Sequence, residues 1–327
     1  MARIIGFSST LKYCLDELQE LLDKEGHELL IGPDYSGVPT EDEVAEMLGE
    51  FLPTADAILL GGAVFTRGLL EKVPNIKTVA RAGVGFDAVD LEATAKRGVP
   101  VTITIHANAD TVADFAMTMM LALTRKLITN HSNLSSGDWT RAIGSDFYGK
   151  TLGIAGLGRI GRAVAIRARA FGMKVLGHEL YPNAEFVREH EIELVDLDRL
   201  CRESDFISLH MPPTPETENC INAERLAMMK PTAYLVNTAR GPLIDEPALL
   251  AALTDGTIAG AGLDVFEVEP LSESPFFGLD NTIVTPHVAG ISEGANQRMI
   301  VQAAKNILAV LSGEWPRDIV VNGVYSD

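Results

Sequence analysis

Three clusters of polar residues follow apolar runs in the C-terminal half of the chain, and their side chains could together carry acid–base chemistry. The clusters contain Arg240 in LVNTARGPLID, Glu269 in AGLDVFEVEP and His287 in IVTPHVAG. A guanidinium offers a planar fork of donors that can hold a carboxylate and polarise a carbonyl group. A histidine can give and retake a proton at neutral pH, and a neighbouring carboxylate would orient its ring and favour its protonated form. These residue types suit proton delivery to a carbonyl next to a carboxylate.

A second candidate site is a glycine pattern between an expected strand and an expected helix. Gly156, Gly158 and Gly161 match G-x-G-x-x-G. The elements expected around them are a strand at Leu152–Ala155, a helix at Arg159–Phe171 and a second strand at Lys174–Gly177, which leads to Glu179. This order, with an acidic residue about 20 positions after the glycines, is the context that the dinucleotide-binding fingerprint requires.

Each of these residues has its own physical role in holding a dinucleotide. Gly156 permits the tight turn, Gly158 lets the backbone approach a pyrophosphate, and Gly161 lets the helix pack closely on the strand. The helix N-terminus supplies unpaired N–H groups and a positive dipole. Glu179 would accept hydrogen bonds from the adenosine ribose hydroxyls and repel a 2′-phosphate, which favours NAD over NADP. The alternative is a glycine-rich turn without a ligand.

Strand-like runs alternate with segments of helical spacing along most of the chain, as in parallel α/β sheets. Before the glycine pattern we expect strands at Arg3–Phe7, His27–Ile31, Ala57–Leu60, Thr78–Ala80 and Val101–Ile103, and helices at Leu11–Lys24, Glu41–Phe51, Leu69–Lys72 and Thr111–Leu127. In an open sheet of this kind, ligands bind at the carboxyl ends of the strands. The three polar clusters should therefore meet at one sheet edge.

The segment Thr111–Leu127 is apolar around most of its circumference. Such a helix is buried, and we expect it between two lobes, with its methionines in the core rather than against a cofactor. A polar stretch, HSNLSSGDWTRAIGSDFYGK, follows it before the next strand-like run.

Composition excludes several classes of protein. The chain has 327 residues, of which 46% are hydrophobic and 22% charged, and its net charge is −18. It is long enough for two domains with buried cores, and its acidic excess disfavours nucleic acid and membrane surfaces as partners. Cys14, Cys201 and Cys220 lack the spacing of a disulfide framework or a zinc cluster, and no signal peptide or membrane span is evident. We therefore expect a cytoplasmic protein with buried thiols and no metal site.

The sequence resembles the D-isomer-specific 2-hydroxyacid dehydrogenase family over most of its length. The motifs that carry the resemblance are RAGVGFDAVDL at 81–91, GLGRIGRAVA at 156–165, LHMPPTPET at 209–217, NTARG at 237–241, LDVFEVEP at 263–270 and TPH at 285–287. The resemblance implies NAD-dependent hydride transfer between nicotinamide and a small D-2-hydroxy acid. It also implies that Arg240, Glu269 and His287 form the catalytic set.

The same resemblance implies the remaining contacts. The backbone N–H groups of Val84 and Gly85, together with Arg240, would bind the substrate carboxylate. The residues implied in cofactor binding are Gly156, Gly158, Arg159, Ile160, Gly161, Glu179, Met211, Thr238 and Asp264, with Glu179 on the ribose. His210 is left out of the catalytic set, because a histidine at a strand end is more often a structural hydrogen-bonding group.

We expect an α/β fold of two doubly wound parallel-sheet lobes. A Rossmann cofactor domain, residues 104–290, is inserted into a flavodoxin-like substrate domain formed by residues 1–103 and 291–327. The chain would cross between the lobes twice, so that they can close around substrate and cofactor. The family also implies a homodimer, for which Ala109–Leu127 is the candidate contact.

Two features bear on the substrate. Phosphoglycerate-type members place an arginine after the third strand, whereas LLGGAVFT at 59–66 has none. Glyoxylate, hydroxypyruvate or another small unphosphorylated 2-oxo acid is thus at least as well supported as 3-phosphoglycerate. A formate-specific relative would carry Gln in place of Glu269. The alternatives to an NAD-dependent enzyme are an NAD(H)-sensing, corepressor-like binding protein with little turnover, and an enzyme that uses NADP.

Overall fold

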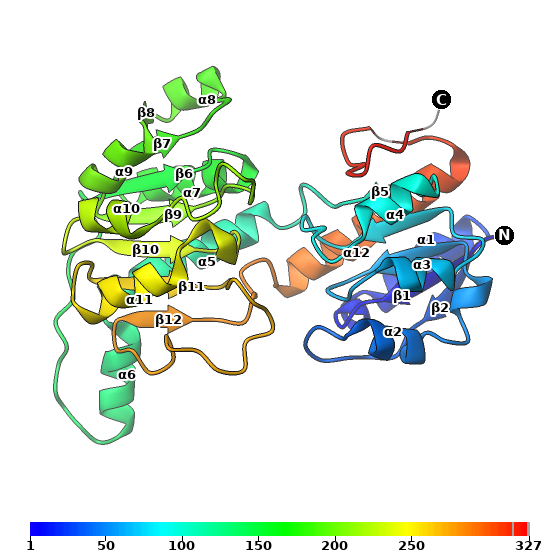
Figure 1. The fold of residues 1–327 in the computed structure, drawn as a ribbon, viewed down its shortest axis with the longest axis horizontal. Helices are drawn as coiled ribbons and strands as arrows, with labels where there is room; N and C mark the ends of the chain where they lie inside the picture. Colours follow the sequence, from blue (N-terminus) through cyan, green and yellow to red (C-terminus); the bar gives the residue numbers. More distant parts are fainter. Residues whose placement is uncertain (316, 326–327) are drawn as a thin grey trace. The chain divides into compact units, whose positions relative to one another are not determined.

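The computed structural model describes residues 1–315 and 317–325. The chain forms two compact units, Met1–Asn108 with Ile291–Asp327, and Ala109–Gly290 (Figure 1). Each unit has its own parallel sheet with helices on both faces, which is the architecture that the alternating sequence pattern predicts. The prediction of an α/β fold with two parallel sheets is confirmed.

The first unit contains a five-stranded sheet in the order β2-β1-β3-β4-β5. Its strands are β1 (Arg3–Phe7), β2 (Glu28–Ile31), β3 (Ala57–Leu60), β4 (Thr78–Arg81) and β5 (Val101–Thr102). Its helices are α1 (Leu15–Lys24), α2 (Glu41–Met47), α3 (Arg67–Glu71), α4 (Leu91–Lys96) and α12 (Glu293–Ser312), with 3-10 turns η1 (Leu11–Tyr13) and η2 (Leu52–Thr54). This is the flavodoxin-like strand order.

Two hydrophobic clusters cover the faces of this first sheet. One contains Leu18 and Leu22 of α1 with Ile300 and Ile307 of α12, all with 0% exposure. The other cluster brings α2, α3 and α4 against the opposite face. A helix from the C-terminal segment therefore completes the core that the N-terminal segment begins.

The first boundary between the units lies at Asn108–Ala109, later than the one expected after Ile103. The intervening residues are tied to the first unit by side chains of α12. Asn306 Nδ2 donates to the Ile103 carbonyl at 3.1 Å, and Arg298 Nε donates to the Ala107 carbonyl at 2.9 Å. These long-range hydrogen bonds extend the unit beyond its last strand.

The second unit contains a seven-stranded parallel sheet in the order β12-β11-β10-β9-β6-β7-β8. Its strands are β6 (Thr151–Ala155), β7 (Lys174–His178), β8 (Glu193–Leu194), β9 (Phe206–Leu209), β10 (Tyr234–Asn237), β11 (Gly260–Leu263) and β12 (Thr282–Val284). Its helices are α5 (Ala109–Thr124), α6 (Leu127–Ser135), α7 (Arg159–Ala170), α8 (Ala184–Glu189), α9 (Leu197–Glu203), α10 (Ala223–Met228) and α11 (Glu246–Thr254), with a 3-10 turn η3 (Gly241–Leu243). The chain changes direction of travel across the sheet between β6 and β9, which makes this pair the switch point where ligands bind in open α/β sheets.

Helix α5 supplies much of the core of the second unit. Met117, Met119 and Met120 are 4%, 2% and 0% exposed and belong to the cluster that α5 forms with α7 and the sheet. The prediction that these methionines lie in a core is confirmed. Their hydrophobic packing partners lie within the second unit, and the location of α5 between lobes stays a prediction.

Helix α6 is an element that the sequence pattern did not indicate. It begins after Lys126, whose φ of 51° is left-handed and separates it from α5. None of its residues is buried, so it has no apolar stripe from which helical periodicity could be recognised. Asn130 holds the following loop, because its side chain exchanges hydrogen bonds of 2.9 Å with both the N–H and the carbonyl of Ala142.

Cys14, Cys201 and Cys220 are unpaired and buried. Burial raises the pKa of the Cys201 thiol to about 12 and that of Cys14 to about 11. These thiols therefore remain protonated at neutral pH and act as small apolar side chains.

Among the described helices, none is long and apolar enough to span a membrane.

Candidate active site

The second sheet places most of the predicted site residues in one row. Strand ends in mutual register are His178, Ala155, Leu209, Asn237, Leu263 and Val284. The residues that directly follow the first five of these ends are Glu179, Gly156, His210, Thr238 and Asp264, and His287 lies three residues after Val284. Parallel strands with matched register bring all of these positions to the carboxyl edge of the sheet. The candidate site therefore extends along this edge.

The turn after β6 requires two glycines for steric reasons. Gly156 has φ of +97°, and a Cβ there would lie 2.7 Å from the carbonyl oxygen of His210. A Cβ on Gly161 would overlap the Gly156 carbonyl oxygen. These contacts hold α7 against the strand ends and bring its N-terminus next to β9.

Gly158 differs from these two glycines because it faces open space. A Cβ at this position would meet no atom within 4 Å, and the residue is exposed. Gly158 is the N-cap of α7, whose first turn begins with Arg159 and Ile160 and has no side-chain cap. Uncapped N–H groups next to unfilled space are what a pyrophosphate needs at a helix N-terminus.

Glu179 lies where a ribose-binding carboxylate is expected, at the end of β7. Its Oε2 accepts a hydrogen bond from the Leu157 N–H at 2.8 Å, and its Oε1 accepts one from the Tyr181 N–H at 3.1 Å. The carboxylate is half-buried and is oriented by the glycine turn itself. This placement joins the acidic residue to the phosphate-binding turn, as the fingerprint requires.

Two buried polar atoms near the switch point have no hydrogen-bond partner among the described residues. They are Oγ1 of Thr238, after β10, and Nδ1 of His210, after β9. His210 Nε2 lies 2.8 Å from the Ser208 hydroxyl, and burial lowers the pKa of His210 to about 3. The ring is therefore neutral at neutral pH, which agrees with leaving it out of the acid–base set. Buried groups of this kind are normally satisfied, so they fit the polar edge of a bound cofactor. Met211, the next residue, is half-buried.

The structure brings His287 and Glu269 into direct contact. His287 Nδ1 lies 2.7 Å from Glu269 Oε2, with side-chain exposures of 48% and 29%. Burial alone would raise the pKa of Glu269, but the hydrogen bond and charge of His287 outweigh it and hold that pKa below its usual range. The carboxylate thus fixes the ring and leaves Nε2 as the nitrogen that can exchange a proton with a substrate.

Asp264 orients the segment that carries His287. Its side chain is fully buried, and Oδ1 accepts from the Thr285 hydroxyl at 2.5 Å and the Val288 N–H at 2.9 Å. Its Oδ2 accepts from the Ala289 N–H at 2.8 Å. These bonds wrap the chain around one carboxylate and hold His287 at φ of +54°, a left-handed conformation that is uncommon for histidine. A direct contact of Asp264 with a cofactor stays a prediction.

Arg240 begins the turn after β10, and its charge acts on the same carboxylate. The Asn237 side chain holds this turn by donating to the Arg240 carbonyl at 2.8 Å and accepting from the Ala239 N–H at 3.0 Å. The positive charge of Arg240 also contributes to the low pKa of Glu269. His287 and Arg240 therefore both act electrostatically on the Glu269 carboxylate.

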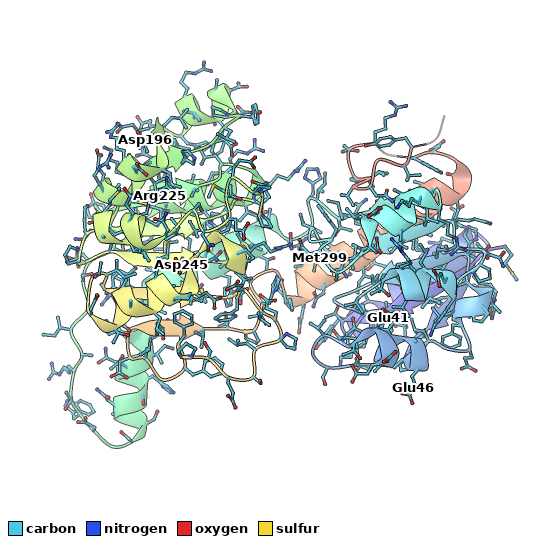
Figure 2. All side chains as sticks on the ribbon, in the orientation of Figure 1. Glu41, Glu46, Asp196, Arg225, Asp245 and Met299 are labelled. Atoms are coloured by element: carbon cyan, nitrogen blue, oxygen red, sulfur yellow. The ribbon has the colours of Figure 1, made fainter. Side chains whose placement is uncertain are left out.

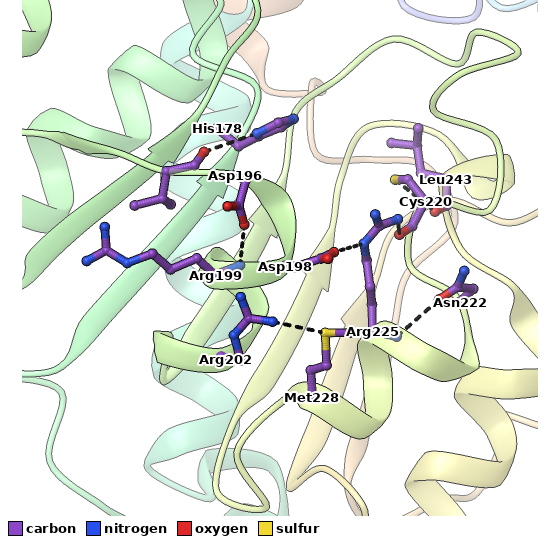
Figure 3. Close-up of polar contacts among 11 residues, drawn as sticks. His178, Asp196, Asp198, Arg199, Arg202, Cys220, Asn222, Arg225, Met228 and Leu243 are labelled. Atoms are coloured by element: carbon purple, nitrogen blue, oxygen red, sulfur yellow. Dashed lines mark hydrogen bonds and ion pairs between the residues drawn. The ribbon is translucent and has the colours of Figure 1, made fainter.

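A network behind this turn fixes the segment that follows Arg240 (Figure 3). Arg225 donates to Asp198 Oδ1 and to the Cys220 carbonyl, both at 2.8 Å. The Cys220 thiol donates to the Leu243 carbonyl at 3.3 Å, and the next residue, Ile221, forms a parallel bridge with Ile244. The start of α11 is thereby tied to α9 and α10.

Val84 and Gly85 lie in the first unit, after β4, where both are half-buried. The Gly85 carbonyl accepts a hydrogen bond from Arg81 Nε at 3.1 Å. Their role in substrate binding stays a prediction. One residue that the sequence analysis did not single out, Glu246, lies 2.7 Å from a backbone N–H of the loop that carries Glu269.

The comparisons with known proteins agree with this geometry. A family profile described as "D-isomer specific 2-hydroxyacid dehydrogenase, NAD binding domain" matches residues 117–289. The glyoxylate reductase of Thermococcus kodakarensis is 39% identical over 315 residues, which cover 91% of each chain. The chain belongs to the D-isomer specific 2-hydroxyacid dehydrogenase family.

Other members of the family resemble this dehydrogenase along different parts of their length. A D-3-phosphoglycerate dehydrogenase of Methanocaldococcus jannaschii is 42% identical over 279 residues, which cover 84% of this chain but 53% of that protein. The structure of a D-lactate dehydrogenase from Aquifex aeolicus, complexed with NAD and lactic acid, superposes with a TM-score of 0.81 at 30% identity and covers 98% of this chain and 99% of that one. The predicted family, fold, enzyme class and NAD cofactor are confirmed, and the roles of individual residues remain predictions.

Proposed function

We propose that this dehydrogenase reduces a small, unphosphorylated 2-oxo acid, with glyoxylate and hydroxypyruvate as the first candidates, to the 2-hydroxy acid, which is the D-isomer where C2 is a stereocentre. The observation that carries the proposal is the 2.7 Å contact between His287 and Glu269 on the sheet edge that also carries the glycine turn. The glyoxylate reductase relative covers most of the chain. In 59–66 there is no cation for a substrate phosphate, and the adjacent Arg67 lies 3.9 Å from Asp90.

Each residue would have one task in this reaction. NADH supplies the hydride when it is bound. Arg240 would hold the substrate carboxylate and polarise its carbonyl, with help from the N–H groups of Val84 and Gly85. His287 Nε2 would donate a proton to the developing alkoxide, and Glu269 would keep the ring oriented and its charged form stable. In the reverse direction, the same nitrogen would accept that proton.

Steady-state kinetics with a panel of substrates tests this proposal. NADH oxidation is followed with glyoxylate, hydroxypyruvate, pyruvate, phosphohydroxypyruvate and bulkier 2-oxo acids, with NADPH in parallel. The proposal predicts that kcat/KM is highest for an unphosphorylated acid of two or three carbons. A preference for phosphohydroxypyruvate would overturn the substrate assignment. Tight NADH binding without turnover of any acid would support the alternative, an NAD(H)-sensing binding protein. The relatives, a glyoxylate reductase and a D-3-phosphoglycerate dehydrogenase, do not favour that alternative.

Glu179 should set the preference for NADH over NADPH, because its carboxylate would repel a 2′-phosphate. Glu179→Ser should raise kcat/KM for NADPH relative to NADH by about tenfold or more, the equivalent of roughly 1.4 kcal/mol. The ratio of the two kcat/KM values measures this change. An unchanged ratio, or a wild type that already prefers NADPH, would contradict the assignment.

We also propose a homodimer. Its contact surface would be residues 127–148 and not the expected Ala109–Leu127, because much of that helix is buried within the second unit. Trp139, Ile143 and Tyr148 are 75%, 91% and 80% exposed in this segment, which supports covering by a second copy. Light scattering should give twice the mass of the chain, and Ile143→Asp should give a monomer. Leu194→Ser removes another exposed apolar side chain and should leave the dimer intact. A monomeric wild type would contradict the proposal.

The cytoplasmic location stays a prediction that cell fractionation can test. The unpaired, buried cysteines support a reducing compartment.

A further inference from the structure

A carboxylate of α11 binds the backbone of the loop that carries Glu269, residues 265–270. Glu246 is the first residue of α11, and its Oε1 accepts a hydrogen bond from the Glu267 N–H at 2.7 Å. The preceding N–H, that of Phe266, donates to Glu269 Oε1 at 2.9 Å. Two consecutive N–H groups of the loop are therefore bound by two carboxylates. One belongs to the loop itself, and the other comes from a helix.

A backbone contact supports the same loop from the Arg240 side. A Cβ on Gly241 would overlap the Phe266 carbonyl group, so the glycine lies directly against the peptide that links Phe266 to Glu267. The Phe266 side chain is 7% exposed and belongs to the hydrophobic cluster that α11 forms with the sheet. The loop is thus held between the turn that carries Arg240 and the start of α11, and Glu246 is the polar part of this support.

The charge of Glu246 also interacts with the charge of Glu269. Burial raises the pKa of Glu246, and the negative charges of Glu267 and Glu269 raise it further, against the opposing effect of the Glu267 N–H. Glu269 in turn is affected by His287 and Arg240. On α11 itself, the neighbouring Asp245 is engaged as the N-cap and accepts from the Ala248 N–H at 3.0 Å (Figure 2). The negative charges of Glu246 and Glu269 therefore repel each other.

We propose that Glu246 is a positioning residue for the reaction: it anchors the 265–270 loop so that Glu269 meets His287. This inference rests on the proposed function. Without the Glu246 carboxylate, the Glu267 N–H would lose its partner, and the loop would sample positions in which Glu269 no longer orients the ring. Without the charge but with an acceptor, the loop would stay in place.

Two substitutions separate these effects. Glu246→Ala removes the acceptor and should lower kcat about tenfold, while the Kd for NADH stays unchanged, because the glycine turn is not involved. Glu246→Gln keeps a carbonyl acceptor and should restore kcat to within about twofold of the wild type.

Asp245→Asn is the matched control. It removes a negative charge one position away but retains a side chain that caps α11, so its kcat should stay close to that of the wild type. Equal loss of kcat in Glu246→Ala and Glu246→Gln would overturn the inference, as would a wild-type kcat in Glu246→Ala. Thermal unfolding verifies that each variant is folded.

Hydrogen exchange of the Glu267 amide gives a readout that does not depend on turnover. The exchange rate should rise at least tenfold in Glu246→Ala and remain near the wild-type rate in Glu246→Gln and Asp245→Asn. An unchanged rate in Glu246→Ala would refute the anchoring. If the wild type reduced no 2-oxo acid but the amide behaved as described, the proposed function would fail while the anchoring would stand.

Discussion

The glycine turn after β6 and the loops after β11 and β12 lie on the same edge of one sheet, but they are built in opposite ways. At the turn, the absence of side chains creates the site: Gly156 approaches His210, and Gly158 leaves open space at a helix N-terminus. At the loops, side chains hold the backbone: three hydrogen-bond donors converge on Asp264, and His287 takes a left-handed conformation. Cofactor binding would therefore depend on space that must stay empty, whereas proton transfer would depend on side chains that hold the backbone in place.

The two regions should respond separately to substitution, because one offers open space at a helix N-terminus and the other a hydrogen-bonded His287–Glu269 pair. A change of His287 or Glu269 should alter the rate of the chemical step and spare cofactor affinity, and a change at the turn should do the reverse. The following substitutions test this separation.

His287→Ala should have the largest effect. Removal of a general acid lowers kcat on the order of 100-fold or more. The Kd for NADH should stay within about twofold, because the ring lies outside the glycine turn. Steady-state kinetics and NADH fluorescence titration measure the two quantities. A wild-type kcat would remove His287 from the mechanism, and a large loss of NADH affinity would contradict the separation of the two regions.

Arg240→Lys keeps the charge but loses the planar fork of donors. A charge-assisted hydrogen bond is worth roughly 1.5–3 kcal/mol, so kcat/KM for the oxo acid should fall about tenfold to a hundredfold. The KM for the oxo acid should rise as kcat falls. Unchanged kinetics would mean that the substrate carboxylate is held elsewhere.

Gly158→Ala and Gly161→Ala form a matched pair at the turn. The Cβ at 158 enters open space, so the free energy of unfolding should stay within about 0.5 kcal/mol of the wild type, while NADH binds about tenfold more weakly. The Cβ at 161 overlaps the Gly156 carbonyl, so this variant should lose about 1–3 kcal/mol of stability. Urea unfolding and NADH titration measure both. Unchanged NADH affinity in Gly158→Ala would show that the open space is not used.

Asp205→Asn should have the smallest effect and should spare both regions. Asp205 accepts from the Thr151 N–H and from Lys230 Nζ, both at 2.9 Å, at the amino end of the sheet. Burial would raise the pKa of this carboxyl, but the two hydrogen bonds outweigh it and lower the pKa. The pKa of Asp205 is lower in the folded state than in the unfolded state. The ionised carboxylate therefore stabilises the fold fully at pH values above the unfolded-state pKa, and this stabilisation is lost as the pH falls through the folded-state pKa.

The substitution should therefore cost about 1 kcal/mol of unfolding free energy at pH 7 and less at about pH 3, because the carboxylate loses its charge as the pH falls. Urea unfolding at both pH values measures the difference, and kcat at pH 7 should not change. An equal loss at both pH values would show that the charge is not the source of the stabilisation.

The glycine turn could be predicted almost completely from the sequence, because its constraints are local. Gly156, Gly158 and Gly161 lie within one turn, and the strand, helix and acidic residue around them follow in order along the chain. The placement of Arg240, Glu269 and His287 could also be predicted, since each follows an apolar strand, and parallel strands bring such ends together.

The support of these residues could not be predicted, because it depends on long-range contacts. Asp264 lies 21 residues from Thr285 in sequence, and Glu246 lies 21 residues from Glu267. Neither pairing leaves a periodic pattern in the sequence. Helix α6 was missed for a related reason, since it buries no residue and so shows no apolar stripe. The sequence therefore indicates which side chains lie at the sheet edge better than it indicates which contacts hold them in place.

Direct transfer of hydride to a 2-oxo acid is the central claim, and isotope transfer tests it most directly. The enzyme is incubated with glyoxylate and NADH that carries deuterium on one face of the nicotinamide C4, and the product is analysed by NMR. The account predicts glycolate with deuterium at C2 from one of the two labelled forms of NADH and none from the other. His287→Ala should form this product on the order of 100-fold more slowly. Unlabelled glycolate from both forms, or no glycolate at all, would contradict the account.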